Sequence, residues 1–250
     1  MFTNAEIMSG IYNSEFFIEY LPIVSLQNGK CIGGEALVRW RKNNTIIPPM
    51  EFIPFLEGSD LLGLLTYWII DKVAEELGPW LRTTPKTYIS LNVPPELFGR
   101  GGLLYVAYKT NCLDIANQFV IEITERGVPD KLGITAINNR HSGALFALDD
   151  VLAHEASLVV LGRLNIDIIK IDKSYTDKIL LESWPTAHDK RFLRILHESN
   201  FFIIAEGIEQ KHQAGVLKDA GIDAGQGWHF SRPLSAEKFK EYYHSHGFNG

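Results

Sequence analysis

Acidic side chains stand at or near the ends of several short apolar runs in this 250-residue chain. The set comprises Glu35, Glu122, Asp149, Asp150 and Glu206. If these carboxylates met in one place, their repulsion would have to be relieved by protonation or by cations. One lysine, Lys170, cannot neutralise five acids, but Lys170 together with two divalent cations could. Because the donors are carboxylates and the amide oxygen of Asn92, with no His or Cys among them, Mg²⁺ or Mn²⁺ is favoured over zinc.

Asp149 and Asp150 are adjacent at the end of the apolar run ALFALDD. Adjacent residues of a regular strand point to opposite faces of the sheet. Where a strand ends the chain turns, so both side chains could still reach one site. The pair could then hold two metal ions about 3.5–4 Å apart, with one aspartate shared between them.

Each of these residues also has a purely structural interpretation. A lone Glu at a strand end is more often a cap or a salt-bridge partner, and an Asp-Asp pair is more often a turn or a helix cap. Lys170 could extend from the rim of a barrel into solvent. What favours a site is the repetition, because seven successive runs each supply a polar group at an equivalent depth.

The elements that position these residues alternate along the chain. Eight runs rich in β-formers cover residues 16–24, 31–40, 87–93, 119–125, 144–150, 166–172, 201–207 and 225–231. Helical patterns cover residues 60–78, 96–110, 130–141, 155–163, 188–199 and 209–220. This order predicts an α/β fold, a (β/α)8 TIM-like barrel, with one domain over residues 1–250 and chemistry at the carboxyl ends of the strands. Asn28-Gly29 predicts a hairpin, so the first strand should be antiparallel.

The composition is that of an ordinary globular protein. It is 46% hydrophobic, and the net charge of −6 argues against a nucleic acid polymer as partner. The two cysteines form no C-x-x-C pattern, and the first ten residues lack the basic and apolar segments of a secretory signal. No apolar run reaches about 18 residues, so no membrane contact is expected. These features together predict a cytoplasmic location.

Seven ordered motifs then resemble those of the EAL domain family, the bacterial phosphodiesterases of cyclic di-GMP. They are GEALVRW (34–40), SLNVPPELF (90–98), IEITER (121–126), LDD (148–150), DIIKIDKSY (167–175), IIAEGIEQKHQ (203–213) and GIDAGQGWHFSRP (221–233). The similarity extends from about Glu15 to Pro233. It implies metal-dependent hydrolysis of cyclic di-GMP to linear pGpG, with cyclic di-GMP as ligand and a homodimer as the assembly.

The resemblance also implies a role for each matching residue. Metal ligands would be Glu35, Asn92, Glu122 and Asp149 for one ion, and Asp150 with shared Asp149 for the second. Catalytic residues would be Lys170, which orients and helps to deprotonate the attacking water, with Glu206 and Gln226 supporting the metals or their waters. Substrate would contact Arg39, which would hold a phosphate, and also Tyr20, Asp223 and Trp228. Glu125 would anchor the loop that follows the aspartate pair.

The chain departs from the family pattern in two places. Leu21 stands where the family usually has a glutamine that helps to hold a guanine edge, and Trp228 where it often has tyrosine. After the aspartate pair, residues 151–158 read VLAHEASL where the family usually reads F-G-T-G-Y-S-S-L, so Leu152 and His154 replace two glycines. Glycine allows backbone angles that other residues adopt only at a cost, so a different loop and a weaker dimer are expected.

Three functions remain open on the sequence alone. The chain could be an active phosphodiesterase, as its intact ligand positions favour. It could be a catalytically weak EAL domain that acts as a cyclic di-GMP receptor or protein-interaction module, as residues 151–156 favour. It could also be a barrel that acts on another phosphodiester.

Overall fold

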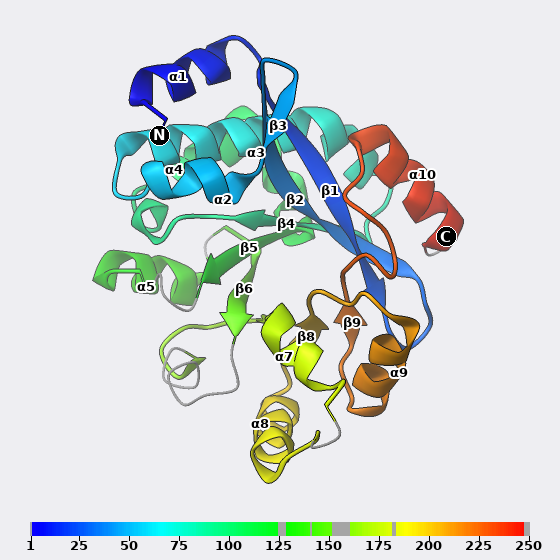
Figure 1. The fold of residues 1–250 in the computed structure, drawn as a ribbon. Helices are drawn as coiled ribbons and strands as arrows, with labels where there is room; N and C mark the ends of the chain where they lie inside the picture. The colour runs from blue at the N-terminus through cyan, green and yellow to red at the C-terminus, as the bar shows by residue number, and fades with distance from the viewer. Residues whose placement is uncertain (1, 125–128, 141, 152–160, 182–183, 248–250) are drawn as a thin grey trace.

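The protein folds as a closed barrel surrounded by helices (Figure 1). The computed structural model describes residues 2–124, 129–140, 142–151, 161–181 and 184–247. Within them the barrel strands are β1 (Phe16–Ser25), β2 (Cys31–Lys42), β4 (Tyr88–Asn92), β5 (Phe119–Thr124), β6 (Leu145–Val151), β7 (Ile168–Ile171), β8 (Phe202–Ala205) and β9 (Ala224–Gly225). The sheet order is β1-β9-β8-β7-β6-β5-β4-β2, and pairing of β1 with β2 closes the ring. The predicted TIM-like α/β barrel is confirmed.

The first strand runs against both of its neighbours, as the Asn28-Gly29 hairpin predicts. The pairs β2–β4, β4–β5, β5–β6, β6–β7, β7–β8 and β8–β9 are all parallel. A short strand, β3 (Thr45–Ile47), extends β2 outside the ring. The carboxyl ends of the parallel strands therefore meet at one end of the barrel.

Helices connect and cover the strands. They are α1 (Asn4–Tyr12), α2 (Pro49–Phe52), α3 (Asp60–Leu81), α4 (Gly102–Lys109), α5 (Lys131–Asn139), α7 (Lys173–Lys178), α8 (Ala187–Glu198), α9 (Lys211–Asp219) and α10 (Ala236–His246). Short 3-10 helices are η1 (Ile53–Phe55), η2 (Pro95–Leu97) and η3 (Leu113–Gln118). None of the helices in the described part of the chain is long and apolar enough to cross a membrane.

Several predicted boundaries differ from the structure. The helix predicted over 96–110 begins only at Gly102, because Gly99 and Gly101 have positive φ angles of 74° and 80° that interrupt a helix. The strand predicted over 225–231 is wrong beyond Gly225, where β9 ends. The helix predicted over 155–163 lies almost wholly outside the described residues.

Apolar side chains fill the barrel from one end only. Ile23, Ile32, Val120, Ala147, Ile168, Ile204 and Ala224 form a buried cluster of their own. A larger apolar core packs between the outer side of the sheet and the helices. With its other end closed by this inner cluster, the barrel leaves room for polar side chains only where the parallel strands finish.

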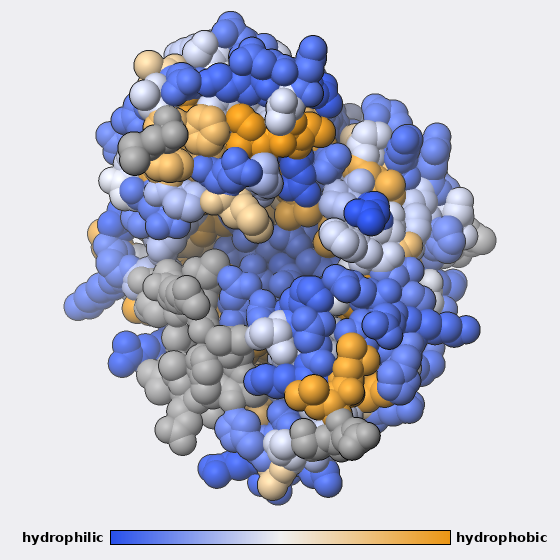
Figure 2. All heavy atoms as spheres, viewed as in Figure 1, coloured by the Kyte–Doolittle hydropathy of each residue, from blue (hydrophilic) through white to orange (hydrophobic). Residues whose placement is uncertain are grey.

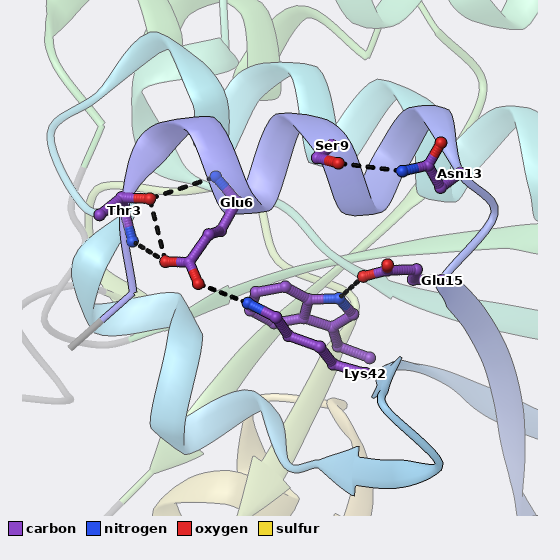
Figure 3. A network of polar contacts seen from close by, with 7 residues as sticks. Thr3, Glu6, Ser9, Asn13, Glu15 and Lys42 are labelled. Atoms are coloured by element: carbon purple, nitrogen blue, oxygen red, sulfur yellow. Dashed lines mark hydrogen bonds and ion pairs between the residues drawn. The ribbon is translucent and has the colours of Figure 1, made fainter.

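The amino-terminal helix α1 contacts the carboxyl-terminal end of β2 (Figure 3). Thr3 and Glu6 form a reciprocal capping box, and the same Glu6 carboxylate pairs with Lys42 at 2.5 Å. Glu15 accepts a hydrogen bond from the indole N–H of Trp40 at 2.8 Å, and the Lys42 ammonium lies 5.1 Å from the centre of that ring. These contacts fix the course of the chain into β1.

Candidate active site

The polar side chains expected at the strand ends meet at the mouth of the barrel. Parallel pairing sets Asn92 opposite Glu122, and Thr124 opposite Asp149. Glu35 is paired with Ser90, two residues before Asn92. The register therefore sets Asn92 and Glu122 at the same level, with Glu35 and Asp149 each offset by two residues on the flanking strands β2 and β6.

Lys170 lies at the centre of four carboxylates and has no exposed surface. Its Nζ is 2.8 Å from Glu206, 2.9 Å from Glu122, 3.1 Å from Asp149 and 3.4 Å from Glu35. A buried lysine is strongly disfavoured unless it is paired. The four ion pairs explain why it is tolerated here, and they show that strands β2, β5, β6 and β8 converge on one point.

Asp149 and Asp150 reach the same site because β6 is irregular between them. The register of β6 with β7 shifts between Leu148 and Val151, and Asp150 has a left-handed φ of 56°. A bulge of this kind re-aims a side chain, and aspartate tolerates the left-handed region better than most residues. As a result, carboxylate oxygens of Asp149, Asp150 and Glu206 lie within 4.8 Å of one another.

Two amides hold the carboxylates in place. Asn92 donates to Glu35 at 3.0 Å, and the Gln226 amide donates to the other Glu35 oxygen at 2.6 Å. The same Gln226 amide donates to Glu206 at 2.9 Å. Gln226 thus links strands β2 and β8 across the mouth, and Glu35 is fixed from both sides.

The carboxylates differ in the direction of their pKa shifts. Burial alone would raise the pKa of Glu35, but the nearby Lys170 and the two amide donors outweigh it and hold this pKa below its ordinary value. Burial, opposed by Lys170 but reinforced by Asp149 and Glu35, raises the pKa of Glu206 to about 8. Burial and its acidic neighbours also raise the pKa of Glu122 well above the ordinary value. The metal-free cluster therefore retains protons at neutral pH.

The residues present fit divalent cations. Both carboxylate oxygens of Glu122 are buried and, beyond the ion pair with Lys170, have no hydrogen-bond donor among the described residues. Hard divalent ions bind to sites with an excess of negative charge and with oxygen donors only. This site has both, and its Glu122 oxygens lack other donors among the described residues. Asp149, Asp150 and Glu206 form the group best spaced to share an ion.

A cavity of about 780 Å³ opens onto this cluster. Asn92, Glu122 and Asp150 line its polar side. A second, mainly apolar part of its lining comes from the segment around α2 and η1 and from α3. It consists of Pro49, Ile53, Leu62, Leu65 and Ile69, together with Glu57 and Thr66. Figure 2 shows the recessed, hydrophilic centre of this face, with apolar side chains along its upper edge. The cavity therefore combines an anionic end with a largely apolar wall.

Two predicted substrate residues, Arg39 and Trp228, lie outside the lining of the cavity. Arg39 follows Glu35 on the same face of β2 and pairs with Glu19 at 2.9 Å. Trp228 has 58% of its surface exposed, and the Arg232 guanidinium lies 4.2 Å from the centre of its ring. Neither borders the cavity in this structure, and their roles toward substrate stay predictions.

The other two predicted substrate residues, Tyr20 and Asp223, contact other parts of the chain, and their roles toward substrate stay predictions. Tyr20 has no exposed surface, and its hydroxyl donates to Glu76 at 2.8 Å, so it packs behind the barrel wall. Asp223 accepts a hydrogen bond from the Ile203 N–H at 2.8 Å, toward the start of β8 and away from the mouth. Both are structural contacts here. Glu125, the predicted loop anchor, lies outside the described residues.

The sequence reasoning missed Asp172 and the apolar wall of the cavity. Asp172 lines the cavity, and its charge helps burial and Asp149 to raise the pKa of Asp150. It stands two residues after Lys170, a strand-end position like those that were recognised. The segment over residues 48–57, which forms this wall, has no regular periodicity, and the proline pair Pro48-Pro49 and the single Pro54 are its only local signals.

Comparisons with known proteins give one consistent result. The family model described as "EAL domain" matches residues 4–233. The chain is 33% identical over 249 residues to "Probable cyclic di-GMP phosphodiesterase PdeB" of Escherichia coli, covering 96% of this chain and 47% of that protein. It is 30% identical over 250 residues to "Cyclic di-GMP phosphodiesterase PdeL" of the same organism, covering 95% of this chain and 67% of that protein. The chain thus spans about half to two thirds of the length of these relatives.

Solved structures agree with the sequence matches. The EAL enzyme Bd1971, in a form with cAMP and cyclic di-GMP bound, superposes with a TM-score of 0.86 at 28% identity, over 96% of this chain and 67% of that chain. The PaMucR phosphodiesterase in complex with c-di-GMP superposes with a TM-score of 0.83 at 25% identity, over 94% of this chain and 98% of that chain. The likeness therefore extends over nearly the whole chain.

Proposed function

We propose a function from a premise that the comparisons establish: the chain belongs to the EAL domain family. The proposed reaction is hydrolysis of cyclic di-GMP to linear pGpG. The observation that carries it is the set of four carboxylates around Lys170, open to a large cavity with an apolar wall. The names of PdeB and PdeL and the nucleotide bound to Bd1971 and PaMucR support the choice of substrate.

Two divalent cations, Mg²⁺ or Mn²⁺, are proposed as cofactors. Glu35, Asn92, Glu122 and Asp149 would hold one of them, and Asp150 with Asp149 the other. When bound, such ions supply an acidified water and neutralise charge on the phosphoryl oxygens.

The chain's own residues would contribute position and charge. A water oxygen attacks phosphorus, the bond from phosphorus to the ribose 3′ oxygen breaks, and the water proton is transferred to that leaving oxygen. The acidic neighbours of Lys170 outweigh its burial and raise its pKa well above the ordinary value, which makes it an ammonium donor that orients the water. Arg39 would exchange Glu19 for a substrate phosphate, and Trp228 would stack on a base.

Incubation of the protein with cyclic di-GMP and MgCl₂ or MnCl₂, followed by chromatography for pGpG, tests the proposal. Asp149→Asn should abolish the product, whereas Asp177→Asn, which alters an exposed aspartate of α7, should not. Cyclic di-AMP serves as the control substrate. If wild-type protein released no pGpG with either metal, or if Asp149→Asn were as active as wild type, the proposal would fail.

A second function rests on the departure at residues 151–158. Of this segment only Val151 is described, but the sequence lacks both family glycines there. A receptor that binds cyclic di-GMP without hydrolysing it would follow if the loop held the second cation poorly. Calorimetry in CaCl₂ beside the turnover assay separates the two, because a receptor binds in the first and is inactive in the second. Sedimentation at several concentrations would test the proposed homodimer.

A further inference from the structure

We propose that a second cavity, on the outer side of the barrel wall, binds a small uncharged apolar molecule. It has a volume of about 270 Å³ and lies between strands β4, β5 and β6 and the elements α4, η3 and α5. Leu91, Phe119, Ile121 and Phe146 form its floor. It shares none of its described lining residues with the cavity at the mouth of the barrel.

The lining defines the chemical class of the ligand. No charged side chain lines the cavity in the described part of the chain, and the side chains able to form hydrogen bonds are Ser142 and Cys112. A charged ligand would lose its hydration there without a counter-charge, which is strongly unfavourable. An apolar ligand gives up no hydrogen bonds to water and gains contacts with leucine, isoleucine and phenylalanine side chains.

The cavity is also accessible and large enough. Leu104 and Leu113 line it and keep 49% and 43% of their surface exposed, so it reaches the outside of the molecule. Alanines at 107, 116 and 136 line it from three different elements and leave the space open. An apolar cavity of about 150 Å³ already takes up benzene. The ligand is therefore a single aromatic ring or a short alkyl chain.

Its position gives the site a physical connection to the barrel mouth. Leu91 and Ile121 on the floor immediately precede Asn92 and Glu122. Because successive strand residues face opposite sides, the floor is the reverse side of the wall that carries those polar groups. A ligand here is separate from the active site and packs directly behind it.

Toluene is the probe for the test, with binding followed by saturation-transfer NMR on the full chain. Ala107→Leu on α4 and Ala136→Leu on α5 fill the cavity from two different helices. Ala187→Leu, at an exposed position at the start of α8, is the matched control. We expect toluene to bind wild type and the control, and to bind each filled variant roughly tenfold more weakly or worse. Toluene should raise the thermal midpoint of wild type and leave that of the filled variants unchanged.

Several outcomes would overturn the proposal. One is no toluene signal with wild type, and another is an equal signal with both filled variants after circular dichroism shows that they are folded. A third is a concentration-dependent dimer in wild type that both filled variants dissociate while toluene fails to bind, because the surface would then belong to a second copy. None of these measurements uses cyclic di-GMP, so they are independent of the proposed activity.

Discussion

Replacing Lys170 by methionine should destabilise the metal-free protein in a way that depends on pH and is reversed by divalent cations. The substitution keeps the length of the side chain and removes the ammonium that lies 2.8–3.4 Å from four carboxylates. Removing one partner of a buried ion pair costs about 3–5 kcal/mol. The carboxylates can lessen that cost only by binding further protons.

The pH dependence follows from which state binds those protons. A buried glutamate kept neutral in the folded state costs about 1.4 kcal/mol for each pH unit above its unfolded pKa of about 4.3. For one group this amounts to about 5 kcal/mol at pH 8 and about 1 kcal/mol at pH 5. The raised pKa of Lys170 stabilises wild type throughout this window, because its stabilisation persists below the unfolded lysine pKa. The difference between variant and wild type should therefore increase from pH 5 to pH 8.

Urea unfolding with EDTA at pH 5 and at pH 8, repeated at pH 8 with excess MnCl₂, measures the effect. Lys173→Met is the matched control, since Lys173 pairs with Asp177 at 2.9 Å and Glu209 at 3.3 Å but is 44% exposed. Lys173→Met should lower the free energy of unfolding by about 1 kcal/mol or less at both pH values. Equal costs for the two variants, or a Lys170→Met cost that neither pH nor Mn²⁺ changes, would refute the assignment of Lys170 as the counter-charge of the cluster.

Four other outcomes are expected. Glu35→Gln should lower turnover by about a hundredfold or more while circular dichroism shows that the fold is kept, because Gln keeps the side-chain length and loses the charge. Ca²⁺ should compete with Mn²⁺ in calorimetry without supporting pGpG release, since it is larger and takes more ligands at longer distances. Because burial and acidic neighbours raise the pKa of Glu206 to about 8, Mn²⁺ binding at pH 7 should release protons, seen as a heat that changes with the ionisation enthalpy of the buffer. Replacing residues 151–156 by Phe-Gly-Thr-Gly-Tyr-Ser should lower the metal concentration that gives half-maximal rate and strengthen the dimer; unchanged metal dependence and sedimentation would show that the loop is a neutral variant.

The fold and the convergence at the barrel mouth could be predicted because they depend on periodicity and on single strand-end residues. Side-chain contacts between elements that are distant in the sequence could not be predicted. Tyr20 lies on a predicted strand, but only its packing against Phe239 and its bond to Glu76 reveal that it faces away from the site. Lys170 likewise lies among carboxylates from four strands only because the sheet closes into a barrel, which the sequence around Lys170 does not reveal.

The wrong strand over 225–231 has a similar cause. Its aromatic residues favour a strand, yet a Cβ at Gly225 would lie 2.3 Å from the Ile208 side chain and one at Gly227 would lie 2.3 Å from the Ile208 carbonyl oxygen. Glycine inside a strand pattern often marks such a close approach. The approach itself depends on the segment that follows β8, which local sequence does not encode.

Position 150 shows how closely the chemistry and the backbone of this site constrain each other. In a regular strand Asp150 would face away from Asp149, and the two carboxylates could not share a site. The register shift after Leu148 removes that restriction, at the cost of a left-handed φ at Asp150. Glycine would accept the angle but offers no ligand, and larger or branched residues offer poor tolerance of it. Aspartate combines a carboxylate with a side chain short enough for this conformation, so the residue proposed as a metal ligand is also one that tolerates the bulge.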